Sequence, residues 1–236
     1  MKLKTVLAAC AVAIFSLAAQ ATSYTWNPKV AEGNWDDAAN WTPNTGYPSG
    51  SGDTAVFAAG STNVVKLNFT SARTIAKLDL SAANIKLTFK LGDGVTRDNA
   101  ALTVSSSGTT VASPTLNLSG KNLDFTLDGV AVSAKSIKPQ MGVASKFSII
   151  NGADFKSDVF YNQSFADGKT MAGNADGGDI YIAGGSTVAM AGLHLQNGLL
   201  EIDDSTFTST YGLRFWNDSD ATTIRLKGKH PLIKMT

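Results

Sequence analysis

The sequence is poor in the residues that build most disulfide scaffolds and metal centres. It holds one cysteine and two histidines among 236 residues, and only two of its acidic residues, Glu32 and Glu201, are glutamates. The cysteine, Cys10, lies in an N-terminal leader, so we expect neither a disulfide framework nor a thiolate metal site after the leader is removed. Little glutamate, abundant Gly, Ser, Thr, Asn and Asp, and no helical periodicity are typical of an all-β, turn-rich protein.

The first residues predict export. Lys2 and Lys4 precede an apolar stretch, and Ala19-Gln20-Ala21 is a small-x-small cleavage site. These features predict a signal peptide over residues 1–21 that is cut after Ala21. No later apolar run approaches the roughly 20 residues of a membrane-spanning helix. We therefore expect a mature chain that is secreted or held at the cell surface or outer membrane, with no transmembrane segment.

The net charge of the chain does not indicate a polyanionic partner. Removal of the leader takes away two lysines and leaves 18 basic against 19 acidic residues, a formal net charge of −1. A near-neutral surface does not indicate nucleic acid or an anionic membrane as a partner. A mature chain of this length buries about 70% of its unfolded surface, which is enough for one sizeable core.

A two-strand pattern recurs along most of the chain. Each copy has two pairs of apolar residues, spaced two apart within the pair, on either side of a short polar turn. Such pairs predict strands with one buried face, and the residues between them suit a turn. The copies are LDLSAANIKLTF at 78–89, LNLSGKNLDFTL at 116–127, IYIAGGSTVAMA at 180–191, LEIDDSTFTSTY at 200–211 and IRLKGKHPLIKM at 224–235.

The recurrence of these copies favours a parallel β-helix, or solenoid, over residues 61–236, and their uneven spacing is compatible with it. Loops of any length can leave such a stack between strands. We expect about seven or eight coils at the usual rise of about 4.8 Å. The first apolar residues of the copies should then lie on neighbouring rungs of one column, namely Leu78, Leu116, Ile180, Leu200 and Ile224. The alternative is an antiparallel β-sandwich or jelly roll, which explains the copies as hairpins but not their repetition.

Residues 22–60 form a separate Trp-rich segment. Tyr24-Thr25-Trp26 is followed by Gly33-Asn34-Trp35, by Asn40-Trp41 and by a Gly-Asp-Thr-Ala-Val-Phe run at 52–57. This order resembles the N-terminal segment of bacterial surface proteins of the autotransporter-associated β-strand repeat and PEP-CTERM type. The resemblance implies a long right-handed β-helix after the segment and no catalytic motif within it. The final KGKHPLIKMT departs from that family, and we interpret the chain as either a truncated solenoid or a degenerate short paralogue.

We interpret the Trp-rich segment as a structural cap. The end of a β-helix has unpaired strand edges and an open apolar core, and Trp26, Trp35, Trp41 and Phe57 offer the ring area to cover it. The carboxylate of Asp53, which precedes a strand, is expected to accept nearby backbone N–H groups. The alternative is a sugar-stacking platform made by Trp35 and Trp41.

Candidates for chemistry are few. Glycoside hydrolysis needs two carboxylates on either side of the glycosidic bond that is cleaved. The available pairs are Asp176 with Asp179, Asp203 with Asp204, and Asp218 with Asp220. The first pair forms a DGGD turn that lacks the full spacing of a calcium loop. Trp216 is a candidate for ligand stacking. His194 and His230 are isolated, so we expect no metal or cofactor.

The sequence therefore favours a secreted or cell-surface protein with a structural or adhesive role and no catalysis. Its expected partners are extracellular glycans or other surface proteins. Two alternatives stay open. One is a polysaccharide-active β-helix enzyme, a lyase or hydrolase. The other is a carbohydrate-binding module that uses Trp35, Trp41 and Trp216.

Overall fold

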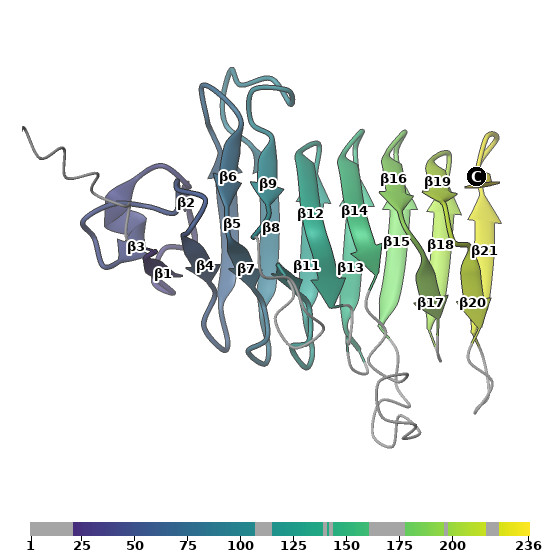
Figure 1. Cartoon of the computed structure of the whole chain (residues 1–236), viewed down its shortest axis with the longest axis horizontal. Coiled ribbons are helices and arrows are strands. Elements are labelled where there is room, and N and C mark those ends of the chain that lie inside the picture. The colour runs from purple at the N-terminus through teal and green to yellow at the C-terminus, as the bar shows by residue number, and fades with distance from the viewer. Residues whose placement is uncertain are drawn as a thin grey trace, which may run out of the picture.

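The chain is wound into coils that lie side by side along the long axis of the molecule, with the strands perpendicular to that axis (Figure 1). Neighbouring described strands are parallel except β1 and β3. Parallel neighbours need crossovers rather than hairpins, so the predicted all-β, solenoid-like fold is confirmed and the antiparallel sandwich or jelly roll is wrong. The computed structural model describes residues 21–106, 115–138, 141, 144–160, 178–195, 198–215 and 222–236.

One sheet takes a single strand from each coil. Its eight strands follow one another in chain order, and the seven that lie within residues 61–236 agree with the seven or eight coils expected there. The eight strands are β2 (Glu32–Asn34), β5 (Thr62–Leu67), β8 (Lys86–Leu91), β11 (Asp124–Asp128), β13 (Lys146–Ile150), β15 (Asp179–Ala183), β18 (Leu199–Asp203) and β21 (Thr223–Lys227).

A 12-stranded sheet takes strands from two successive positions in the coil. The first position holds β6 (Arg73–Ile75), β9 (Leu102–Val104), β12 (Ala131–Lys138), β14 (Asp154–Phe160), β16 (Thr187–Met190), β19 (Thr206–Ser209) and β22 (Leu232–Met235). The second holds β1 (Ser23–Trp26), β3 (Trp41–Thr42), β4 (Thr54–Val56), β7 (Lys77–Asp79) and β10 (Leu116–Asn117). The long strand β12 pairs with both β9 and β10 and so joins the two positions.

Two small elements complete the described part of the chain. A two-stranded sheet of β17 (Leu193–Leu195) and β20 (Leu213–Phe215) follows β16 and β19 in the chain. A three-residue 3₁₀ helix, η1 (Ala38–Asn40), lies in the Trp-rich segment. Among the described residues, no helix is long and apolar enough to cross a membrane.

The core lies between the sheets because alternate strand residues point inward. In β8, Leu87 and Phe89 are buried, whereas Lys86 on the opposite face is exposed. The register repeats this alternation from rung to rung, so the buried residues stack into continuous columns. One column of the eight-stranded sheet is Leu87, Phe125, Phe147, Ile180 and Leu200, and the next is Phe89, Leu127, Ile149, Ile182 and Ile202.

Aromatic rings form a continuous row inside the core. The ring of Phe125 lies 5.2 Å from that of Phe89 and 5.3 Å from that of Phe147, and Phe147 lies 5.2 Å from Phe155. Offset and edge-to-face aromatic pairs contribute about 0.5–1.5 kcal/mol each beyond the burial of their area. This row links three consecutive rungs of one sheet to a strand of the other.

The expectation of one apolar column through all five repeat copies is wrong. Leu78 pairs with Leu116 in the 12-stranded sheet, whereas Ile180, Leu200 and Ile224 pair in succession in the eight-stranded sheet. In the two early copies the first strand belongs to the 12-stranded sheet and the second to the eight-stranded sheet. In the three late copies the order is reversed. The residues form two columns, because a spaced apolar pair suits either corner.

Asparagines shape several of the corners. Asn84, Asn122 and Asn151 adopt left-handed backbone conformations with φ of 59°, 54° and 57°, which asparagine tolerates better than most residues. The side-chain amide of Asn122 also donates to Oδ1 of Asn84 on the preceding rung at 2.8 Å. These residues therefore act as turn asparagines, and two of them also form a ladder.

Ion pairs join neighbouring rungs on the outer face of the eight-stranded sheet. Glu201 accepts from Arg225 and Lys227 at 3.0 Å each. These hydrogen bonds, that of Lys227 foremost, hold the pKa of Glu201 below its ordinary value. At the other end of the sheet Glu32 pairs with Lys66 on the next rung and with Lys90 on the rung after that. Each exposed pair adds little stability, but opposite charges on adjacent rungs favour the observed register.

Truncation of one ring in the aromatic row should destabilise the whole stack. Phe125 is fully buried, and Phe125→Ala removes its contacts with the rungs on both sides. We expect a loss of about 3–5 kcal/mol in the free energy of unfolding, measured by urea denaturation. The control Thr126→Ala, one residue along the same strand on the outer face, should cost about 0.5 kcal/mol or less. Equal losses for the two variants would contradict the inward orientation of Phe125.

Candidate functional site

The tryptophans of residues 22–60 form one buried cluster at the N-terminal end of the core. Trp26 and Trp35 are fully buried, and Trp41 is 1% exposed. The ring of Trp41 lies 5.0 Å from that of Trp26 and 4.9 Å from that of Trp35. Trp35 also meets Phe89 of the first coils at 5.7 Å, and Phe57 lies over Trp26 and Trp41. The cluster thus continues the aromatic row of the core.

The polar atoms of this cluster are satisfied within the segment. Nε1 of Trp26 donates to the carbonyl of Val30, that of Trp35 to the carbonyl of Pro48, and that of Trp41 to the carbonyl of Trp35. A sugar-stacking platform needs an exposed ring face, which neither Trp35 nor Trp41 has. The platform alternative for these two residues is therefore wrong.

Asp53 organises the backbone beside the cluster. Its carboxylate accepts the backbone N–H groups of Ser49, Gly50 and Thr22 at 3.0, 2.8 and 3.2 Å. The residue is 9% exposed, and its own carbonyl accepts from Ala76 in the next coil. This is the bonding expected from its place before a strand.

The predicted acidic site at 176–179 is described only in part. Asp176 lies outside the described residues, as do Trp216 and the Asp218–Asp220 pair. Asp179 begins β15, where its carboxylate accepts the hydroxyl of Tyr181 at 3.2 Å and the backbone N–H of Leu199 at 3.0 Å. Burial, reinforced by this carboxylate, raises the pKa of Tyr181. Both bonds tie Asp179 to its own and the next rung.

Asp204 has a comparable structural role. It occupies a left-handed corner with φ of 44°, and its carboxylate accepts the backbone N–H groups of Lys229 and His230 on the next rung. These bonds, that of His230 foremost, lower the pKa of Asp204. His230 is exposed, and the side chain of His194 lies outside what the structure describes. Across the described ranges, no group of three His, Cys, Asp or Glu residues is placed to hold a metal ion.

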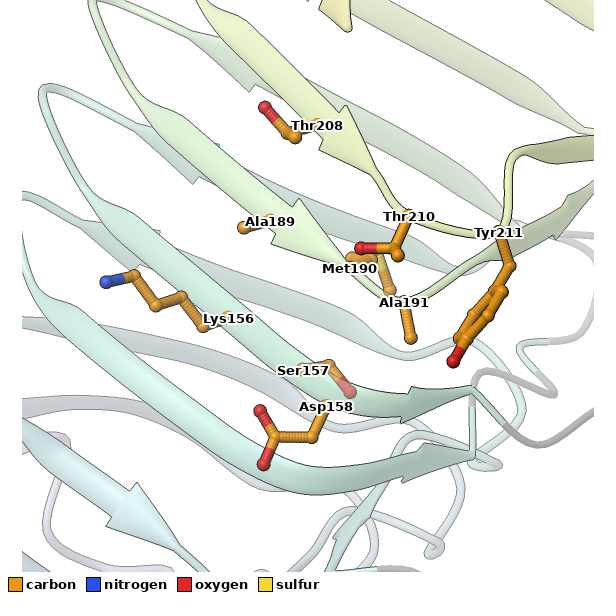
Figure 2. Close-up of a pocket in the computed structure, with 9 residues that line it drawn as sticks. All are labelled: Lys156, Ser157, Asp158, Ala189, Met190, Ala191, Thr208, Thr210 and Tyr211. Carbon is orange, nitrogen blue, oxygen red and sulfur yellow. The ribbon is translucent and has the colours of Figure 1, made fainter. Parts of the chain in front are cut away.

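The outer surface of the 12-stranded sheet is hollowed over β14, β16 and β19. The hollow, whose lining residues are drawn in Figure 2, has a volume of about 340 Å³. Lys156, Ala189 and Thr208 are paired across the three strands. Because Ala189 has the shortest outward side chain of the three, and Ala191 follows it, the surface dips along β16 between longer neighbours. We call this feature the β16 groove.

The two walls of the β16 groove differ in character. One wall carries Lys156 and Asp158, and Asp158 also pairs with Lys135 at 3.3 Å. The other carries the hydroxyls of Thr208 and Thr210 and the ring of Tyr211, as Figure 2 shows. The groove therefore offers both charges, several hydroxyls and one aromatic face.

Tyr211 is an aromatic side chain held out into solvent on an ordered turn. It is 76% exposed, the highest value among the exposed large hydrophobic residues of the described chain. Its backbone N–H donates to the carbonyl of Ala191 at 2.6 Å, and the next N–H, of Gly212, donates to the hydroxyl of Ser209. The backbone that carries the ring is thus held by the neighbouring rungs, which reduces the ordering cost of stacking against a ligand.

Sequence reasoning missed the β16 groove. Tyr211 closes the copy at 200–211, but nothing in that copy distinguishes it from other turn residues. The groove exists only because β14 lies beside β16, and those strands are separated by 26 residues between Phe160 and Thr187. The alternating alanines of VAMA at 188–191 were the available signal.

No family model, curated protein or solved structure matches the chain. The geometry of the described residues is therefore the basis for any assignment.

Removal of a buried cap ring should unfold the N-terminal coils. Trp35→Ala deletes a fully buried ring and the bond to the Pro48 carbonyl, so we expect a loss of about 3–5 kcal/mol in the free energy of unfolding. The matched control Tyr211→Ala removes an exposed aromatic ring and should change stability by about 0.5 kcal/mol or less. Thermal and urea unfolding followed by tryptophan fluorescence measures both. A Trp35→Ala protein of unchanged stability would argue against the cap.

Proposed function

We propose that this chain is a secreted or cell-surface β-solenoid with a structural and adhesive role and no catalytic activity, and that the β16 groove is its contact for extracellular glycans. The single observation that carries the proposal is an exposed aromatic ring beside a groove formed by three rungs of a rigid sheet. Export rests on the signal peptide expected over residues 1–21. The resemblance of residues 24–57 to bacterial surface proteins supports the same location.

The chemistry of the groove suits a sugar chain better than an apolar ligand. Sugars present hydroxyl edges and apolar ring faces, so they need both hydrogen-bonding groups and an aromatic surface. Thr208 and Thr210 supply hydroxyls that donate and accept, Asp158 accepts, and Lys156 donates. Tyr211 supplies the ring. The groove is open, which fits an extended chain lying along β16 more than an enclosed small molecule.

A weak single site is consistent with an adhesive role. Each contact in an exposed groove contributes little, but many copies of the protein on one surface would bind a polysaccharide together. Linked weak contacts gain affinity through effective concentration without any new interaction. A rigid solenoid is suited to this task because it holds each groove at a fixed orientation.

Binding to a glycan array tests the groove directly. We expect Tyr211→Ala to weaken the binding of the bound glycan about three- to tenfold, the equivalent of about 0.5–1.5 kcal/mol for one aromatic contact. Tyr181→Ala is the matched control, because it removes a tyrosine from the other sheet and should leave affinity unchanged. Failure of the native chain to bind any glycan, or equal losses for both variants, would refute the role of the groove.

A catalytic assay separates this proposal from a polysaccharide-active enzyme. Incubation of the protein with a polysaccharide panel, with and without Ca²⁺, should release no reducing ends and no unsaturated products. The controls are a known hydrolase and a known lyase on the same panel. Product release that scales with protein concentration would overturn the structural role in favour of the enzyme.

A further inference from the structure

Asp53 is an almost buried carboxylate with no cationic partner among the described residues. It is 9% exposed, and none of the ion pairs in the described part of the chain includes it. Its contacts are three backbone N–H groups. Buried charges in proteins are normally paired, because desolvation of an unpaired ion is costly.

One of those three donors is the nitrogen of Thr22. This atom lies 3.2 Å from Oδ1 of Asp53. Strand register holds it there, since the carbonyl of Thr22 accepts the N–H of Thr54 at 2.9 Å and Ser23 pairs with Thr54 between β1 and β4. The sequence predicts that the signal peptide is cut between Ala21 and Thr22. The nitrogen beside Asp53 is therefore the one that cleavage would release.

We propose that removal of the signal peptide creates the counter-ion of Asp53. A leader peptidase adds one water across the Ala21–Thr22 bond. The carboxylate leaves on Ala21, and the Thr22 nitrogen becomes an ammonium group with no net gain or loss of protons. An uncharged amide donor thereby becomes a charged one at the same position. This inference rests on the export part of the proposed function and not on glycan binding.

The new ion pair strengthens the cap at the moment of export. Charge-assisted hydrogen bonds are about twice as strong as neutral ones, and the Asp53 carboxylate joins the chain start to the turn at Ser49 and Gly50. The Asp53 carbonyl also accepts from Ala76, so the same residue links the chain start to the next coil. The mature chain is then more stable at its N-terminal end than the precursor, whose Thr22 nitrogen is an amide.

The test moves the ammonium group by one residue. The full precursor and a precursor with one alanine inserted after Ala21 are exported in a bacterial host, and intact mass identifies each mature N-terminus. The insertion leaves the Thr22 nitrogen as an amide and places the charge about 3.8 Å further along the chain. We expect the native mature protein to unfold about 2–4 °C higher than the inserted one.

A thermodynamic cycle assigns the difference to Asp53. In the Asp53→Asn background the two N-termini should unfold at the same temperature, whereas in the control Asp124→Asn background, on an outward position of β11, the difference should persist. Equal midpoints in the parent pair overturn the inference even where Asp53→Asn does not fold, and a difference that survives Asp53→Asn overturns it too. The inference is also overturned if the intact mass shows that the mature protein does not begin at Thr22, but that result does not affect the glycan test. A failed glycan test, in turn, does not affect the inference about Asp53.

Discussion

A single coil of this chain has no interior of its own, and every other feature of the molecule depends on that constraint. The inward side of a rung is covered only by the rung before it, the rung after it and the opposite sheet. Parallel pairing in strict register is the arrangement that stacks buried residues such as Leu87, Phe125 and Phe147 on one another. The end of the stack is left uncovered by the same logic, and the Trp26, Trp35 and Trp41 cluster lies there.

The fold class could be predicted from the sequence because alternation and turn chemistry are local. LEIDDSTFTS contains strand residues on both sides of one corner, and Leu200, Ile202 and Phe207 are buried as the pattern requires. The phase of the repeat could not be predicted. Spaced apolar pairs look alike at either corner, so Leu78 and Ile180 seemed equivalent although they belong to different sheets. The register between rungs depends on residues that are far apart in the chain, so it could not be derived from local patterns in a single sequence.

The same limit applies to the sites. Whether Trp35 is a cap ring or a binding platform depends on Phe69 and Phe89, which come from later coils and cover it. The β16 groove depends on which side chains border Ala189, and those come from β14 and β19. The role of Asp53 was easier to predict, since two of its three donors, Ser49 and Gly50, are sequence neighbours. Residues that act on close neighbours were predictable, and those that act between rungs were not.

The unequal lengths of the coils have a mechanical consequence. Rungs bond only to adjacent rungs, so a force applied along the long axis would peel the stack one layer at a time from its weaker end. Ile180 and Leu200 are paired across 20 residues, and Lys86 and Asp124 across 38. At about 3.5 Å per extended residue, the unfolding of these two coils would release about 70 and 130 Å of chain. A copy pulled along that axis would thus lengthen in discrete steps of different size and absorb work at each step.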